Sequence, residues 1–247
     1  MATGLLIVVA VACHTTPVTG RKSFNLYSAQ DDVQIGREAY AQVLAEGKVV
    51  KSGPELEMVK RAMTRLTAVA DDPGYEWEVN LLDDDQTVNA FALPGGKMAV
   101  YTGILPVCKT EAGLAVVMGH EIGHVVAQHG TERISSTLGI DTFLSYLNIG
   151  DYASLAQVGL DVLVNRPFGR KQESEADEIG LIYMAMAGYD PREAISFWER
   201  MEAQSGGSQP PEFLSTHPSH ETRVERLKAK LPEAMEKWRE AGGRASP

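Results

Sequence analysis

Residues 111–129 read EAGLAVVMGHEIGHVVAQH. Apolar residues fall on nearly every side of a helix here, so the stretch predicts a buried helix, with Thr110 placed to cap its start. His120 and His124 stand four residues apart, on one helix face, where both imidazoles can bind the same metal ion. Two histidines and a glutamate are costly to bury unless they are bonded. We therefore expect a zinc site in which Glu121 activates a water molecule.

A third zinc ligand has to come from another segment. A second predicted helix, 170–188, offers four carboxylates: Glu173, Glu175, Asp177 and Glu178. Glu173 and Asp177 share one helix face, so one can bind zinc while the other accepts a hydrogen bond from a ligand histidine. Spacing alone does not decide which of the two carboxylates binds zinc and which accepts the hydrogen bond. The alternative is that these acidic residues are only the solvated start of a helix. His129, five residues past His124, is expected to point to another side of its helix as a packing or capping residue.

The remaining hydrophobic patterns predict an α+β fold that is mostly helical. Apolar residues recur with the helical period in further segments, namely 29–47, 55–69, 135–165 and about 220–241. Strands are predicted around Trp77–Leu81, at Thr87–Leu93 and at Met98–Tyr101. Pro94–Gly96 predicts a tight turn between the last two strands. The expected architecture is a small antiparallel sheet among many helices.

Composition narrows the class of partner. The chain has 247 residues, enough for one substantial domain with an N-terminal extension, or for two small domains at most. A net charge of -10, without a cluster of lysine and arginine, argues against a nucleic-acid partner. The two cysteines, Cys13 and Cys108, are poorly placed for a disulfide framework, and Cys108 is expected to be a buried apolar residue.

The N-terminus carries eight consecutive apolar residues, Leu5–Ala12, followed by Cys13. A helix needs about 20 residues to span a bilayer, so this run is too short, but it has the length of a signal-peptide core. Val11–Cys13 resembles a bacterial lipoprotein cleavage site, and we expect a signal peptide at residues 1–13 with a lipid anchor at Cys13. A plain signal peptide and an unprocessed N-terminus remain alternatives. No other segment is apolar for long enough to cross a membrane.

Four blocks of the sequence resemble one family, the zinc metallopeptidases that include HtpX, the CAAX prenyl proteases and OMA. The blocks are Asn89–Gly96 with Tyr101–Leu105, His120–His124, Arg170–Asp177, and Ser215–His220 with Arg223 and Leu227. With Pro17–Arg21 they cover about residues 17–230, in the family's order. The resemblance is greatest to the periplasmic lipoprotein branch of LoiP and BepA type. Gly113 and Gly169 depart from the family pattern, away from the ligands.

The resemblance implies a role for each candidate residue and one Zn²⁺ per chain. It selects Glu173 as the third ligand and makes Asp177 the carboxylate that orients a ligand histidine. His217 is our candidate for a second donor to the oxyanion or for a reversible fourth ligand that gates the site; a loop histidine beside a proline turn is the alternative. The predicted strand at Thr87–Leu93 is expected to bind an extended polypeptide by main-chain hydrogen bonds. Its substrate-binding residues would be Asn89, Ala90, Phe91 and Ala92.

These expectations describe a zinc-dependent endopeptidase of the zincin type. The expected domain is 54–235, after a tether and helix at 14–53 and before a tail at 236–247. The resemblance implies unfolded or misassembled envelope proteins as substrates, in protein quality control in the bacterial periplasm, with a lipid anchor to the outer membrane. Two other classes stay open: a zinc-stabilised chaperone or scaffold that does not cut, and a zinc hydrolase of small molecules. Replacing Glu121 would separate scaffold from enzyme, and a closed pocket would favour the small-molecule hydrolase.

Overall fold

Helices make up most of the fold. The computed structural model describes residues 12–25, 27–204, 211–218 and 222–243. Its helices are α1 (Ala29–Glu46), α2 (Pro54–Thr67), α3 (Leu105–Cys108), α4 (Glu111–Val126), α5 (His129–Leu138), α6 (Ile140–Ile149), α7 (Tyr152–Val164), α8 (Arg170–Met186), α9 (Glu193–Gln204), α10 (Glu212–Thr216) and α11 (Arg223–Glu240). Its strands are β1 (Ala12–Thr15), β2 (Lys22–Asn25), β3 (Glu78–Leu82), β4 (Ala90–Leu93) and β5 (Lys97–Tyr101). The mostly helical α+β class predicted from the sequence is confirmed.

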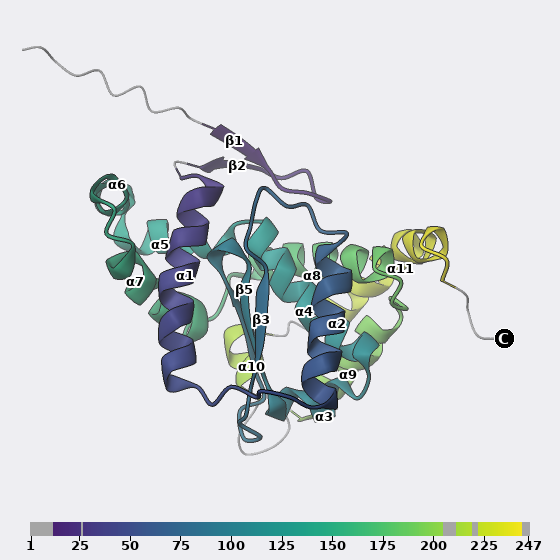
Figure 1. The fold of residues 1–247 in the computed structure, drawn as a ribbon. Coiled ribbons are helices and arrows are strands. Elements are labelled where there is room, and N and C mark those ends of the chain that lie inside the picture. The colour runs from purple at the N-terminus through teal and green to yellow at the C-terminus, as the bar shows by residue number, and fades with distance from the viewer. Residues whose placement is uncertain (1–11, 26, 205–210, 219–221, 244–247) are drawn as a thin grey trace, which may run out of the picture.

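A three-stranded sheet runs through the middle of the domain in the order β3-β5-β4 (Figure 1). β4 and β5 form the expected antiparallel hairpin, with Phe91 opposite Ala99. The structure adds a parallel pairing of β3 with the other edge of β5. The turn between β4 and β5 requires glycine, because Gly95 has a φ of 72° and a Cβ there would lie 2.5 Å from the Cα of Val33. This close approach seats α1 against the hairpin.

The helix that carries the His-Glu-x-x-His motif is buried, as expected. The Thr110 side chain accepts a hydrogen bond from Gly113 N at 3.1 Å and so caps α4. Every residue from Gly113 to Val126 is buried. The helix ends earlier than expected, at Val126, because Gln128 adopts a left-handed conformation with a φ of 57°. His129 therefore begins a separate helix, α5.

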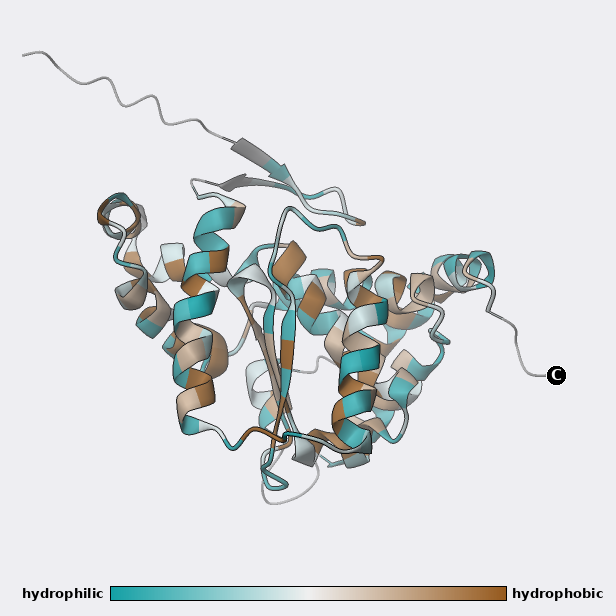
Figure 2. Ribbon diagram, viewed as in Figure 1, coloured by the Kyte–Doolittle hydropathy of each residue, from teal (hydrophilic) through white to brown (hydrophobic). Residues whose placement is uncertain are grey.

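Two apolar clusters hold these elements together. One cluster joins α2, α4, α8, α9 and α11 on one face of the sheet, and the other joins α1, α5, α6 and α7 on the opposite face. Figure 1 shows α1 and α2 on either side of β3 and β5, with α4 and α8 behind them. Polar and apolar positions alternate along α1 and α2 in Figure 2, as expected for helices with one face on a core. The predicted helical stretch 135–165 is confirmed within α5, α6 and α7.

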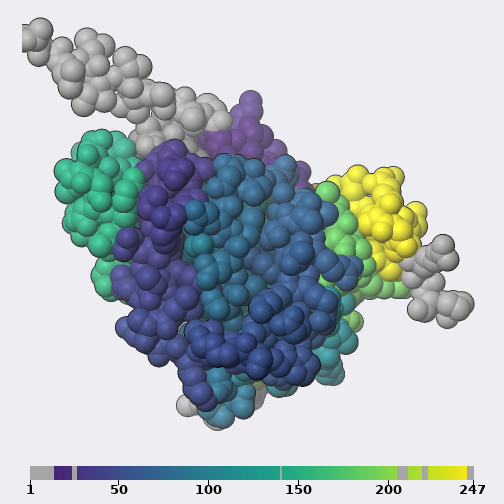
Figure 3. Space-filling model, viewed as in Figure 1, coloured from purple at the N-terminus to yellow at the C-terminus, as the bar shows by residue number. Residues whose placement is uncertain are grey.

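The polar stretch after Cys13 is not the tether that the sequence suggested. β1 and β2 form an antiparallel hairpin in which Thr15 pairs with Lys22. His14 Nε2 lies 3.2 Å from the carbonyl oxygen of Val126, at the end of α4. The purple atoms of this hairpin sit on the upper edge of the domain in Figure 3. The segment is thus part of the folded structure rather than a spacer.

Parts of four predictions fall outside the described residues. These are residues 1–11 of the expected signal peptide, residues 219–220 of the last family block, residues 220–221 of the last predicted helix and residues 244–247 of the expected tail. Cys13 itself lies in β1. Within the described ranges, no helix combines the length and the apolar character needed to cross a bilayer.

Candidate metal centre

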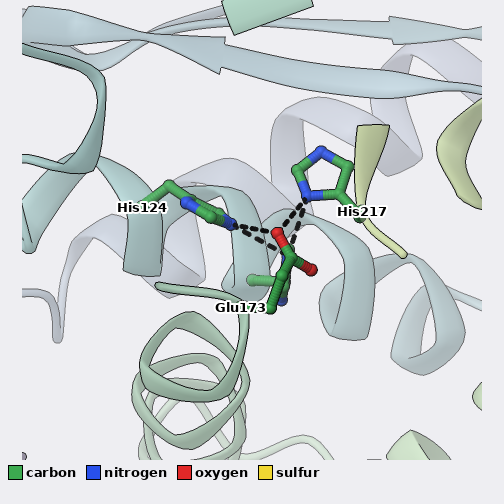
Figure 4. Close-up of side chains that lie close together, drawn as sticks. His124, Glu173 and His217 are labelled. Carbon is green, nitrogen blue, oxygen red and sulfur yellow. Dashed lines mark hydrogen bonds and ion pairs between the residues drawn. The ribbon is translucent and has the colours of Figure 1, made fainter. Parts of the chain in front are cut away.

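Four candidate ligands meet in the interior. His120 and His124 come from α4, Glu173 from the first turn of α8, and His217 from the end of α10. One ligand atom from each lies within 4.8 Å of the others. None of the four residues is more than 3% exposed. Figure 4 shows the Glu173 carboxylate pointing between the imidazoles of His124 and His217.

The donor set fits zinc, which takes imidazole nitrogen and carboxylate oxygen in a tetrahedral arrangement. Bonds of about 2.0–2.1 Å place two ligand atoms of a tetrahedron about 3.3 Å apart. The Nε2 atoms of His120 and His124 are 3.1 Å apart, and His124 Nε2 is 3.4 Å from Glu173 Oε1. All three atoms are acceptors when both imidazoles are neutral with the proton on Nδ1, so they repel one another unless a cation lies among them.

Electrostatics keep two of the candidate ligands, His124 and Glu173, in the forms that bind metal, whereas at His120 the nearby carboxylates of Glu173 and Asp177 outweigh the effect of burial and raise the pKa. Burial lowers the pKa of His124 well below its ordinary value, so its imidazole is neutral. Burial acts to raise the pKa of Glu173, but the nearby His217 and His120 outweigh it and hold that pKa well below the usual range. The carboxylate is therefore ionised. A neutral imidazole and an ionised carboxylate are the states that coordinate zinc.

Asp177 contacts the outer side of the His120 ring. Asp177 Oδ1 lies 2.9 Å from His120 Nδ1, the ring nitrogen that faces away from the candidate ligands. Arg223 Nε donates to Asp177 Oδ2 at 2.8 Å, and the same guanidinium pairs with Glu173. Arg223 is 1% exposed, so it is a fully buried countercharge for both carboxylates. The sequence placed Arg223 in the last family block without suggesting this role.

His129 lies against the second candidate ligand. Its Nδ1 is 3.0 Å from His124 Nδ1, and its Nε2 is 3.0 Å from Glu175 Oε2. The sequence suggested that His129 would point elsewhere, because a continuous helix was assumed. The left-handed Gln128 breaks that helix and returns His129 to the site. No sequence signal marked the break, since glutamine seldom adopts a positive φ.

Glu121 lies between β4 and the candidate ligands. Its Oε2 accepts a hydrogen bond from Ala92 N at 3.0 Å. Its Oε1 is buried and has no hydrogen-bond partner among the described residues; His217 Nε2 is 3.4 Å away. Burial raises the pKa of the Glu121 carboxyl. This oxygen therefore lies beside one of the candidate ligands, His217, without a hydrogen bond to the described part of the chain.

The predicted substrate strand is a sheet edge. The main-chain N–H and C=O groups of the odd-numbered residues point toward β5, as the hydrogen bond from Tyr101 N to Asn89 O at 3.1 Å shows. Even-numbered residues face outward: Ala90 N donates to the Asn89 side chain at 2.9 Å and Ala92 N to Glu121. The carbonyl of Val88 accepts from Phe213 N of α10 at 3.0 Å. The outward edge of β4 thus meets Glu121 at one end and α10 at the other.

Comparison with known proteins agrees with this geometry. The family model described as "Peptidase family M48" matches residues 54–231 of the chain. The mitochondrial metalloendopeptidase OMA1 of Schizosaccharomyces pombe is 38% identical over 90% of this chain and 67% of its own length. OMA1 of Saccharomyces cerevisiae is 33% identical over 89% of this chain and 69% of its own length. The beta-barrel assembly-enhancing protease of Escherichia coli K12 is 27% identical over 87% of this chain and 47% of its own length.

These relatives overturn one prediction. The sequence suggested the bacterial periplasm, because of the short apolar run before Cys13 and the resemblance to the periplasmic LoiP and BepA branch. The two OMA1 proteins are named as mitochondrial and have higher identity to the chain than the Escherichia coli protease does, which contradicts the predicted bacterial periplasm. The family prediction itself is confirmed. The match over residues 54–231 and the OMA1 relatives establish that the chain belongs to peptidase family M48 and is a zinc metalloendopeptidase.

Proposed function

We propose that this endopeptidase cleaves unfolded or misassembled polypeptides that bind as an added strand along β4. The observation that carries the proposal is the position of Glu121, which takes the Ala92 N–H with one oxygen and leaves the other free beside the ligand set. A general base must lie within hydrogen-bond reach of both the attacking water and the substrate backbone. Glu121 meets that need at the sheet edge.

His120, His124 and Glu173 would hold the zinc ion. When bound, zinc lowers the pKa of a water molecule and stabilises negative charge on the scissile carbonyl. Glu121 Oε1 would take the proton of the attacking water and pass it to the nitrogen of the leaving amine. Asp177 would keep the proton of His120 on Nδ1, which leaves Nε2 free for the metal. These roles follow from which ring nitrogens face the ligand set.

The β4 edge supports a substrate class without strict sequence choice. The outward N–H groups of Ala90 and Ala92 bond to the side chains of Asn89 and Glu121, and a substrate strand would take the place of these side-chain partners through main-chain hydrogen bonds that do not depend on its sequence. Only a polypeptide that can extend locally can pair with such an edge, and folded proteins seldom expose such segments. The name of the Escherichia coli relative, an assembly-enhancing protease, fits a role in protein quality control.

We further propose that His217 is a reversible fourth ligand that closes the site. Its Nδ1 lies 3.2 Å from His120 Nε2 and 3.1 Å from Glu173 Oε1, among the ligand atoms. α10 also covers the start of the substrate edge, because Phe213 N is bonded to Val88 O. Displacement of α10 would therefore free both the substrate edge and one zinc position. A role of His217 as a fourth ligand is favoured over a role as an oxyanion donor, because an oxyanion donor would have to face the substrate rather than the ligands.

The decisive experiment measures zinc content and casein cleavage for the purified chain and for Glu121→Gln. We expect about one zinc per chain in both proteins and cleavage only in the unchanged one, with a loss of at least about 100-fold in the variant. Glu57→Gln, on the exposed face of α2, is the matched control and should cleave normally. Zinc in both with undiminished cleavage in Glu121→Gln would contradict the assigned base. Zinc with no cleavage, even after His217→Ala, would favour the scaffold.

A further inference from the structure

A chain of side-chain contacts links the N-terminal hairpin to one candidate ligand. It runs from Arg21 through Glu175 and His129 to His124. We propose that the β1–β2 hairpin is a positioning element that sets the orientation and tautomer of His124 and thereby raises zinc affinity. The inference rests on the proposed role of His124 as a zinc ligand.

The contacts of His124 and His129 fix the position of the proton on each ring. His124 Nε2 faces the ligand set, 3.1 Å from His120 Nε2, so it must be free of a proton to bind metal. The proton of the neutral ring is then on Nδ1, which donates to His129 Nδ1 at 3.0 Å. His129 must accept there, so its own proton is on Nε2 and is donated to Glu175 Oε2 at 3.0 Å. One carboxylate thus determines the tautomers of two imidazoles in series.

A break in the helical backbone at Gln128 makes the contact between His129 and His124 possible. In a continuous helix a residue five positions on is turned by about 140° from the first, so His129 would point away from His124. Gln128, with a φ of 57°, turns the chain back. Gln128 Nε2 donates to the buried Asp32 of α1 at 3.1 Å, which holds the turn in place. A residue other than glycine takes this conformation at some cost, so its neighbours have to stabilise it.

The hairpin anchors Glu175. Thr19 Oγ1 donates to Glu175 Oε1 at 2.6 Å, and Arg21 Nε donates to Glu175 Oε2 at 2.6 Å. Both oxygens are therefore held, and the carboxylate cannot rotate away from His129. Arg21 Nη2 also donates to the carbonyl of Ala127 at 3.1 Å. That carbonyl lies at the end of α4, where helix carbonyls lack partners within the helix.

The two histidines on α4 are therefore both oriented by carboxylates of α8, but the hairpin holds only one of these carboxylates, Glu175. His120 is oriented by Asp177 of the neighbouring helix α8. His124 is oriented through His129 by Glu175, whose partners Thr19 and Arg21 lie between β1 and β2. Figure 1 shows this hairpin at the top of the view, at the N-terminal end of the described chain. A shift of the hairpin would therefore change the orientation of His124, and with it the zinc affinity, without any change in α4 itself.

The test measures the zinc dissociation constant by competition with a chromogenic chelator. Loss of an outer partner of a ligand histidine typically weakens metal binding about 10- to 100-fold. We expect that loss in His129→Phe, and about 3- to 10-fold in Thr19→Val/Arg21→Gln, where the carboxylate remains but is free to rotate. Arg37→Gln, which removes an exposed ion pair with Glu76, is the matched control and should bind as tightly as the unchanged protein.

Two further readouts separate positioning from a general effect on folding. Long-range proton–nitrogen NMR of the zinc-loaded protein should show His124 with its proton on Nδ1 and His129 with its proton on Nε2. In the His129→Phe background, the two hairpin substitutions should add less than about 2-fold to the dissociation constant, because the link is already cut. His129 protonated on Nδ1, or hairpin variants that bind zinc unchanged, would overturn the inference.

The outcomes also keep this inference apart from the proposed function. If the unchanged protein binds no zinc, the proposed function fails. If it binds zinc and cleaves casein while the hairpin and His129 variants bind equally well, only the positioning role fails. Should His129→Phe not fold, the NMR tautomers and the Thr19→Val/Arg21→Gln variant still decide the question.

Discussion

Gly180 of α8 and Gly119 of α4 touch backbone to backbone: a Cβ added to Gly180 would lie 2.7 Å from the carbonyl carbon of Gly119. Two helices can approach this closely only where side chains are missing. Gly119 directly precedes His120. Glu173 lies two turns before Gly180, on the same face of α8. The glycine contact therefore sets the distance across which the α8 carboxylate reaches the α4 histidines.

Gly180→Ala should separate the two helices. The added methyl meets backbone atoms, which cannot move aside as a flexible side chain can, so we expect a loss of about 1–3 kcal/mol in the free energy of unfolding. Zinc affinity should fall as well, because Glu173 would no longer reach the two histidines. Urea unfolding of the zinc-free protein and chelator competition measure the two effects. Gly159→Ala is the matched control, since its methyl would meet only the end of the Ile134 side chain.

Arg223→Gln should destabilise the protein strongly. The change leaves Glu173 and Asp177 buried without their countercharge, and breaking a buried ion pair typically costs about 3–5 kcal/mol. Excess zinc should restore part of the loss, because the ion supplies positive charge beside Glu173. Unfolding curves with and without zinc would show this. Arg166→Gln, at an exposed ion pair, should change the unfolding free energy by less than about 1 kcal/mol.

The core of the site was predictable because it is encoded locally. The i, i+4 histidines and the apolar surroundings of α4 predicted a buried metal helix from one stretch of chain. Glu173 and Asp177 were equally placed by spacing, and the resemblance to a family was needed to separate their roles. Their contacts now differ: Asp177 meets His120 Nδ1 on the outer side of the ring, whereas Glu173 faces the Nε2 atoms.

The features that escaped prediction depend on residues far apart in the chain. The position of His129 follows from a left-handed Gln128, which is held by Asp32 at the other end of a 96-residue separation. The hairpin looked like a tether because its stabilising partners, such as Glu175, lie in α8. The predicted compartment was wrong because it rested on an apolar run of eight residues, which is a weak local pattern, and on the resemblance to the LoiP and BepA branch, whereas the OMA1 relatives are more similar to the chain.

His217→Ala should raise casein cleavage, by about 2- to 10-fold, if the side chain closes the site as proposed. The variant loses a ligand atom that competes for the zinc position, while His120, His124 and Glu173 remain. Zinc should stay bound, although more weakly. Initial rates and zinc content on the same samples provide the measurement. A loss of cleavage of more than about 10-fold, with zinc retained, would instead identify His217 as an oxyanion donor.

Asp32 is a buried carboxyl that accepts hydrogen bonds from Tyr75 and Gln128 at 3.1 Å and from Thr131. Burial raises its pKa from 3.8 to about 6, and these hydrogen bonds only partly oppose the rise. Between these two values the folded state holds more protons than the unfolded state. The resulting stability is present in full below the lower value and is lost as the pH rises through about 6.

Asp32→Asn lacks this titration. From pH 7.5 to pH 4.5 the unchanged protein should therefore gain about 2 kcal/mol of unfolding free energy relative to the variant. The measurement is urea unfolding of both proteins at the two pH values with a chelator present, so that loss of zinc in acid does not enter. The histidines titrate in both proteins and cancel in the difference. Parallel stability profiles for the two proteins would show that Asp32 is already ionised in the folded state at pH 4.5, against the effect of its burial.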